Sequence, residues 1–205
     1  MEEQIINMPA VALRGLTILP GMIAHFDVSR ERSLRAIEEA MEQDQKIYLV
    51  TQKNVDREDP TQEDLYQMGI VADIKQVVRL QNDVVRILVD GISRAKLLGF
   101  TSCEKYLEAE ICYFDSNKDS LPEDLREAML LGVREAFHRY AAVIGKISKE
   151  LIRQIHQYED LEKLIDYVTN NLPVSYELKQ QVLEAEDIND RYQVIVSLLL
   201  SQVEV

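Results

Sequence analysis

Three histidines and two cysteines are the side chains best suited to bind a metal ion or to act as nucleophiles in this chain of 205 residues. They are His25, His138, His156, Cys103 and Cys112. No Cys-x-x-Cys pair occurs, and the scattered histidines do not complete a recognisable zinc motif with the cysteines. We therefore expect no metal site. Without a secretion signal, we expect both cysteines to be reduced thiols.

Catalytic and nucleotide-binding motifs are also missing. Gly145 and Lys146 form a Gly-Lys pair, but Ile147 follows where a phosphate-binding loop needs a hydroxyl group. Ser148 and Lys149 are adjacent, so on a helix they point about 100° apart, and Ser148 is better explained as a helix cap. Neither a Gly-x-Ser-x-Gly elbow nor a His-Glu-x-x-His pair is present. We expect no catalytic residue in this chain and no cofactor bound to it.

The composition is that of an acidic globular protein. The formal net charge is −13, hydrophobic residues make up 46%, and both halves of the chain are acidic. Nucleic-acid binding requires clustered lysines and arginines, so nucleic acid is an unfavourable partner. No apolar run approaches the roughly 18 residues of a membrane span. The acidic start lacks the features of a secretion signal, and we expect a cytoplasmic protein without a membrane partner.

The apolar pattern changes near residue 115 and predicts two domains, 1–115 and 116–205. In the first, runs rich in β-branched residues predict strands at 11–19, 46–52, 69–80, 84–100 and 106–114. A helix is predicted at 30–44, capped by Ser29 or Ser33, and a short helix at 61–67, where Thr61 and Asp64 fit a capping box. Asn82-Asp83 predicts a tight hairpin, and Gly91 a bulge.

The second domain has helical periodicity throughout. Five helices are predicted, at 120–147, 148–157, 159–172, 176–185 and 188–205, with caps at Ser120, Ser148, Ser175 and Asp187. The last helix ends while its pattern is still apolar, which leads us to expect a longer natural chain.

The stretch from Ala12 to Ser33 gathers apolar side chains around the break Pro20-Gly21. Three interpretations compete: a buried strand pair, a membrane-seeking segment, or an apolar surface for another polypeptide. The membrane interpretation is weakest because no apolar run in this stretch approaches the roughly 18 residues that span a bilayer.

This stretch resembles the opening motif of the amino-terminal domain of Lon, the family of bacterial ATP-dependent proteases. The family motif is Leu-Arg, Leu/Phe/Tyr-Pro, an apolar stretch and Val-x-Arg-x-x-Ser. Its positions are occupied by Leu13, Arg14, Pro20, Val28, Arg30 and Ser33. The resemblance continues in the family's order through 49–53, 59–80, 86–98 and 164–199, so it covers essentially the whole chain.

The resemblance implies an α+β fold: a PUA-like β-barrel subdomain with an embedded helix, followed by an all-α helical bundle. It implies a non-catalytic domain that engages unfolded or damaged polypeptides, contacts other Lon subunits and assists hexamer assembly. In the parent enzyme, ATP and Mg belong to a separate ATPase module, and a Ser-Lys protease module cuts the substrate. We expect the isolated chain to be a monomer or dimer.

Six residues are candidates for a weak apolar site that accepts unfolded chains. They are Leu19, Pro20, Met22 and Ile23 beside the break, with Leu80 and Val84 flanking the hairpin. The competing explanation is that all of them belong to the barrel core. Two other functions remain open: RNA binding, which the spread negative charge disfavours, and a stand-alone Lon-N-like adaptor without protease modules.

Overall fold

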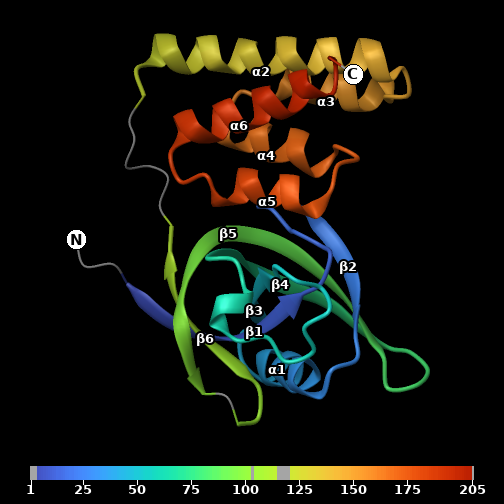
Figure 1. The fold of residues 1–205 in the computed structure, drawn as a ribbon, viewed down its shortest axis with the longest axis vertical. Helices are drawn as coiled ribbons and strands as arrows, with labels where there is room; N and C mark the ends of the chain where they lie inside the picture. The colour runs from blue at the N-terminus through green and yellow to red at the C-terminus, as the bar shows by residue number, and fades with distance from the viewer. Residues whose placement is uncertain (1–3, 103, 115–120, 205) are drawn as a thin grey trace. The chain divides into compact units, whose positions relative to one another are not determined.

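The computed structural model describes residues 4–102, 104–114 and 121–204. The chain divides into two compact units, 1–114 and 115–205 (Figure 1). Within the described residues, the first unit is a mixed β-sheet with one α-helix, and the second consists of five α-helices. This is the α+β class that the sequence predicts.

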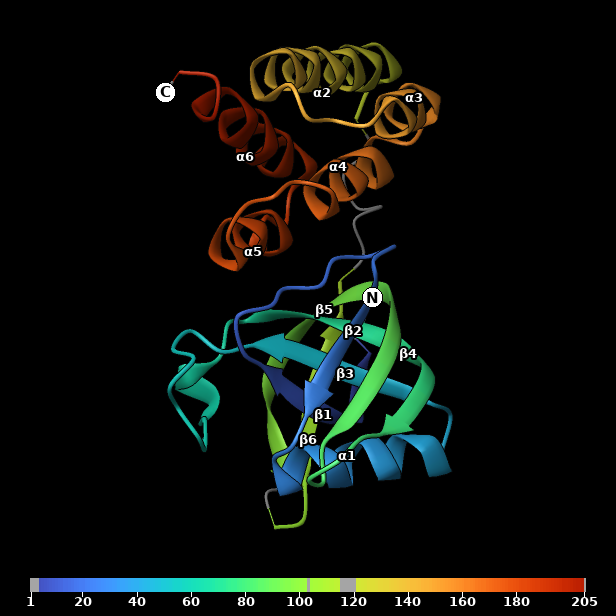
Figure 2. The ribbon, with the colours of Figure 1, turned by 90° about the vertical axis from the view of Figure 1, so that its right-hand side faces the viewer.

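The sheet of the first unit curls back on itself (Figure 2). Its strands are β1 (Ile5–Leu13), β2 (Ile23–Val28), β3 (Lys46–Thr51), β4 (Met68–Arg79), β5 (Val85–Ser102) and β6 (Leu107–Tyr113), in the order β2-β5-β4-β3-β1-β6. The first part of β5 pairs with β2, and the second part pairs with β6, which also pairs with β1. The sheet is nevertheless not a regular closed barrel, because among the described strands β2 pairs with β5 alone.

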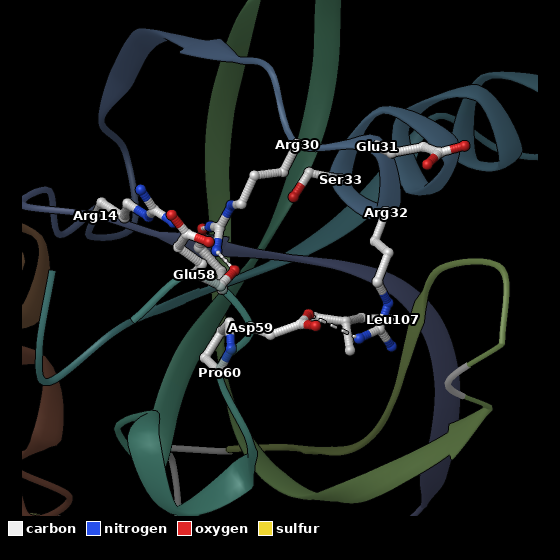
Figure 3. A pocket seen from close by; sticks show the side chains of 10 residues that line it. Arg14, Arg30, Glu31, Arg32, Ser33, Glu58, Asp59, Pro60 and Leu107 are labelled. Carbon is white, nitrogen blue, oxygen red and sulfur yellow. Dashed lines mark hydrogen bonds and ion pairs between the residues drawn. The ribbon is translucent and has the colours of Figure 1, made fainter. Parts of the chain in front are cut away.

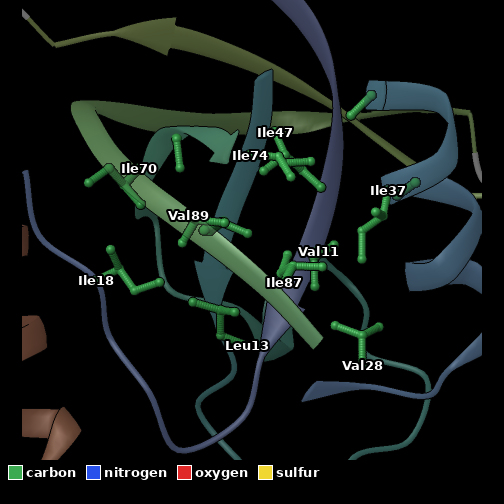
Figure 4. Packing of buried hydrophobic residues seen from close by; sticks show 14 of the residues in the cluster. Val11, Leu13, Ile18, Val28, Ile37, Ile47, Ile70, Ile74, Ile87 and Val89 are labelled. Atoms are coloured by element: carbon green, nitrogen blue, oxygen red, sulfur yellow. The ribbon is translucent and has the colours of Figure 1, made fainter. Parts of the chain in front are cut away.

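The two faces of this sheet bury two separate apolar clusters. Alternate residues of β1 and β3 supply them, as the two-residue period of a strand requires: one cluster takes Val11, Leu13, Ile47 and Leu49, the other Ala10, Ala12, Tyr48 and Val50. Helix α1 (Glu31–Glu42) covers the first cluster with Ala36, Ile37 and Ala40. Figure 4 shows this cluster, with β4 and β5 contributing Ile70, Ile74, Ile87 and Val89.

The predicted strand at 11–19 is wrong in its bounds. β1 begins at Ile5 and ends at Leu13, and Gly15 follows with a φ of 68°. A positive φ breaks the extended backbone, and glycine adopts it without steric cost. The chain resumes as β2 at Ile23, a strand that the sequence analysis does not predict.

In the sheet unit, the predicted turn at Asn82-Asp83 and the predicted bulge at Gly91 are confirmed, whereas the predicted cap of α1 is wrong. Asn82 and Asp83 both have positive φ, 62° and 59°, in the tight turn predicted here, and the Leu80 N–H donates to the Val84 carbonyl across it at 2.8 Å. A register shift lies beside Gly91 in the pairing of β4 with β5. The cap predicted at Ser29 or Ser33 is wrong, because α1 begins after Arg30 without a side-chain cap.

The helical unit packs around its longest helix. Its helices are α2 (Glu123–Ile144), α3 (Lys149–Gln157), α4 (Leu161–Asn170), α5 (Tyr176–Glu184) and α6 (Ile188–Ser201). α2 packs against α6, α4 and α3, and buries Met129, Val133, Phe137 and Tyr140. Gly145 ends α2 with a φ of 69°, where the sequence predicts a break.

Cap predictions in this unit have mixed outcomes. The Ser148 and Asp187 side chains accept hydrogen bonds from Leu151 and Asn189 backbone N–H groups, as predicted. Ser175 is at the N-cap of α5 without a side-chain bond. The predicted cap Ser120 and Cys103 lie outside the described residues, whereas Cys112 is buried and its Sγ donates to the Tyr113 carbonyl at 3.6 Å.

Candidate functional site

The six predicted site residues differ widely in exposure. Ile23 is 68% exposed, whereas Leu19 is fully buried at 0%. Leu80 is exposed, and Pro20, Met22 and Val84 are half-buried. Leu19 therefore belongs to the core, and its side chain does not reach the surface as the prediction required.

A tight backbone connection explains this division. The Gly21 N–H donates to the Gly91 carbonyl, and the Gly91 N–H donates to the Met22 carbonyl, both at 2.9 Å. These two hydrogen bonds hold the turn Pro20-Gly21 against β5, and the Leu19 side chain before the turn lies in the core. Along β2 the side chains then alternate, so that Ala24 and Val28 are buried while Ile23 faces solvent.

The predicted residues form two groups instead of one. Ile23 pairs with Asp90, and Val28 pairs with Val85, next to the hairpin. The two pairs are separated by five residue steps along β2, which correspond to about 17 Å of strand. Leu80 and Val84 therefore lie at the opposite end of β2 from Ile23.

Each group has an exposed neighbour that the sequence analysis did not single out. Ile92 follows Gly91 at the turn, and Val78 precedes Leu80 on the same face of β4. The turn patch is here defined as Pro20, Met22, Ile23 and Ile92. The hairpin patch is defined as Val78, Leu80 and Val84. The two-residue period of β4 could have indicated from the sequence that Val78 is exposed. Ile92 lies at the bulge beside Gly91, where the period is interrupted, so its exposure is known only from the structure.

A charged pair borders the hairpin patch. The Arg86 Nε donates to Asp27 Oδ1 at 2.7 Å across the β2–β5 pairing. This hydrogen bond lowers the pKa of Asp27 and raises that of Arg86. Both groups are solvated, so the pair keeps this rim polar and adds little stability.

A pocket of about 430 Å³ lies between the start of α1 and the loop before η1 (Gln62–Asp64) (Figure 3). Its lining contains three arginines and three acidic residues, so their formal charges sum to zero. They are Arg14, Arg30, Arg32, Glu31, Glu58 and Asp59. Three of its lining residues, Arg14, Arg30 and Ser33, occupy positions of the motif that carries the resemblance described above.

The arginines of this pocket hold the loop to the sheet. Arg30 donates through Nη2 to the Ala12 carbonyl at 2.7 Å and through Nη1 to the Glu58 carbonyl at 3.1 Å. Arg32 forms an ion pair with Asp59 at 3.3 Å. Burial lowers the pKa of Arg30, and the charge of Arg14 adds to this. The geometry is that of a structural brace, in which Arg14 and Arg30 donate to backbone carbonyls and Arg32 pairs with Asp59.

Neither a metal centre nor a membrane segment emerges from the described residues. Within 4–102, 104–114 and 121–204, no three His, Cys, Asp or Glu side chains gather closely enough to hold an ion. In the same part of the chain, every helix falls short of the length and apolarity of a membrane span.

The fold and the sequence both match known proteins. Residues 7–201 match the family described as the ATP-dependent protease La (LON) substrate-binding domain. The chain therefore belongs to the family of Lon substrate-binding domains.

Curated relatives of similar sequence carry the name Lon protease. The Lon protease of Lachnoclostridium phytofermentans is 37% identical over 205 residues, which is 100% of this chain and 25% of the relative. That of Clostridioides difficile is 35% identical over 97% of this chain and 26% of its own length. This chain thus spans about a quarter of the curated relatives that it matches.

Solved structures share the fold at low identity. The N-terminal domain of a Mycobacterium avium complex Lon protease aligns with a TM-score of 0.78 and 19% identity, covering 95% of this chain and 98% of that one. A Lon N-terminal domain protein from Xanthomonas campestris aligns with a TM-score of 0.64 and 12% identity, covering 94% and 98%.

Proposed function

We propose that this chain is the polypeptide-binding region of an ATP-dependent Lon protease, and that the turn patch contacts apolar segments of unfolded or damaged proteins. The observation that carries the proposal is Ile23, a large apolar side chain 68% exposed beside a rigid turn. Ile92, 42% exposed, follows Gly91 in the connection and adds a second exposed apolar side chain, while Met22 is half-buried against the core cluster and contributes only its outer part.

Such a surface suits ligands of many sequences. Apolar contact is non-directional, so it does not demand one arrangement of hydrogen-bonding groups in the ligand. Met22 adds a flexible thioether that adapts to different side chains. The hairpin patch, at the far end of β2, provides a second contact of the same kind for a longer segment.

The proposed role is binding alone. ATP hydrolysis with Mg and peptide cleavage are assigned to parts of the Lon protease outside the matched quarter, and this region requires no cofactor. We also propose that it works in the cytoplasm and contacts other Lon subunits during hexamer assembly. Light scattering measures the oligomeric state of the isolated chain, for which we expect a monomer or dimer; a stable hexamer would contradict that expectation.

Binding of a reduced and alkylated model protein tests the turn patch. The double variant Ile23→Ser and Ile92→Ser should bind about fivefold more weakly or worse, because part of the contribution of two buried isoleucines is lost. The matched control is Leu131→Ser on α2, a side chain 62% exposed in the other unit. Wild-type affinity in the double variant, with weaker binding in the control, would place the site on the helical unit instead.

A further inference from the structure

Two histidines that are 18 residues apart in sequence meet on the surface of the helical unit. His138 on α2 and His156 on α3 have their Nε2 atoms 2.6 Å apart, and their ring centroids are separated by 4.7 Å. Both side chains are exposed. One Nε2 must donate a proton and the other must accept it, so the two rings share a single proton along this line.

A neighbouring arginine fixes the approach of the two rings. Arg134 lies one turn before His138 on the same face of α2. Its Nη2 donates to the backbone carbonyl of His156 at 3.2 Å and to that of Tyr158 at 2.6 Å. The end of α3 is therefore anchored to α2 beside the histidine pair, and the rings face each other on a defined backbone.

The rest of α3 is weakly attached. Ile155 is the one fully buried residue of this helix, and the helix contacts α2 and α4 along short stretches. An additional link between His138 and His156 should consequently make a large contribution to the stability with which α3 packs on the rest of the unit.

We propose that His138 and His156 form a two-histidine site for a first-row divalent cation, with Zn²⁺ and Ni²⁺ as the matching ions. Zinc binds imidazole nitrogens at about 2.0–2.1 Å, so tetrahedral coordination requires the two nitrogens to be about 3.3 Å apart. Small rotations of two exposed rings provide this separation. The cation then takes the place of the shared proton.

The chemistry of the pair determines which ions fit. Neutral imidazole suits zinc, nickel and copper, whereas Mg²⁺ and Ca²⁺ prefer oxygen ligands. No third His, Cys, Asp or Glu of the described residues completes the site. Water fills the remaining positions, and the exposure of both rings gives the ion direct access from solvent. This site is independent of the turn patch and of the proposed function.

Calorimetric titration of the purified chain with ZnCl₂, and separately with NiCl₂, tests the site. We expect one ion per chain, unaffected by excess MgCl₂. His138→Ala and His156→Ala should each raise the dissociation constant tenfold or more, since loss of even an outer-shell partner costs roughly 10–100-fold. His25→Ala removes the remaining histidine, an exposed residue of the first unit, and should bind like wild type. Circular dichroism confirms that each variant is folded.

Three outcomes would overturn the proposal. They are an absence of binding by the wild-type chain, wild-type affinity in both His138→Ala and His156→Ala, and loss of binding in His25→Ala. Hydrogen exchange supplies a second measurement. Zn²⁺ should slow exchange in residues 149–157 of the wild-type chain but not of His138→Ala. Binding without this protection would contradict a bridge between the two helices.

Discussion

The two units obtain their specificity in different ways. In the sheet unit, β1 pairs with β3 and β6, which lie far along the chain, and special backbone conformations occur at Gly15, Gly21, Asn82 and Asp83. In the helical unit, the longest helix α2 packs mainly on α6 and α4, and buried polar side chains such as Arg191 and Gln180 lie inside the unit. Among the described residues, positive φ is concentrated in the first unit, with Gly145 as the counterpart in the second, whereas both units bury polar side chains, such as Arg94 in the first and Arg191 in the second.

Arginine illustrates the contrast. Arg30 braces a surface loop of the sheet unit and is half-buried. Arg191 lies inside the helical unit with 1% exposure, and its Nε and Nη2 donate to the Ala185 carbonyl at 3.1 and 3.0 Å. A desolvated guanidinium whose donors are engaged is costly to remove, because its partners are left unsatisfied.

The largest expected effect comes from removing Arg191, with Arg30 as the comparison in the sheet unit. Arg191→Ala should lower the free energy of unfolding of the helical unit by about 3 kcal/mol, through a cavity and unsatisfied carbonyls. Arg30→Ala should cost the sheet unit about 1 kcal/mol, since water replaces its exposed bonds. Hydrogen exchange under denaturant, followed by peptide for each unit, measures both values. Equal losses would contradict the contrast between buried and surface bracing.

A methyl group added to glycine tests the backbone side of the comparison. A Cβ on Gly91 would lie 2.6 Å from the Leu19 carbonyl oxygen and 2.9 Å from Ile70 Cδ1. Gly91→Ala should therefore destabilise the sheet unit by about 2 kcal/mol through overpacking.

The matched control is Gly132→Ala on α2. Its Cβ meets the hydroxyl end of Tyr192, a movable side chain, and alanine improves helix propensity by about 1 kcal/mol. The two contributions oppose each other, so the net change should be small. Thermal unfolding monitored by circular dichroism compares the variants. A greater loss in Gly132→Ala than in Gly91→Ala would reverse the comparison.

The smallest effect concerns two surface carboxylates, one in each unit. The backbone N–H of Thr61 lowers the pKa of Asp64 below its ordinary value of 3.8, and hydrogen bonds from Arg153 and then Gln154 lower that of Glu150 below 4.5. Since each pKa is lower in the folded state, its contribution to stability is present above the ordinary value. It is lost as the pH falls from there through the folded pKa.

High salt should change the pKa values of these two carboxylates by different amounts. At about 0.5 M NaCl the exposed pairing with Arg153 is screened, so the pKa of Glu150 should move toward 4.5. The pKa of Asp64 should move less, because its largest cause is a backbone hydrogen bond in a capping box. Carboxyl NMR titration at low and high salt measures both. An equal salt response of the two groups would show that Asp64 depends on charge instead.

Much of the fold is readable in the sequence because it is local. Strand periodicity places β3, β4 and β6 within one or two residues, and helical periodicity with caps at Ser148 and Asp187 places the later helices. β2 is not among the predicted strands, since the first of them ends at residue 19, before the break Pro20-Gly21. The residues after it do alternate, with Ala24 and Val28 buried.

The candidate site is less predictable, for a physical reason. Hydrophobicity places Leu19 and Ile23 in one apolar stretch, yet one is fully buried and the other is the most exposed of the six predicted residues. The bonds between Gly21, Met22 and Gly91 decide between them, and they join segments 70 residues apart.

The amino-acid sequence by itself determined the class of fold, the change from strands to helices near residue 115, and most helix and strand positions, since periodicity and turn chemistry act over a few residues. Only the tertiary structure decided which apolar side chains are exposed to solvent. It alone also brings Arg14 and Arg30 of the opening motif together in one pocket and His138 next to His156. These depend on contacts between distant segments, whose geometry no local pattern encodes.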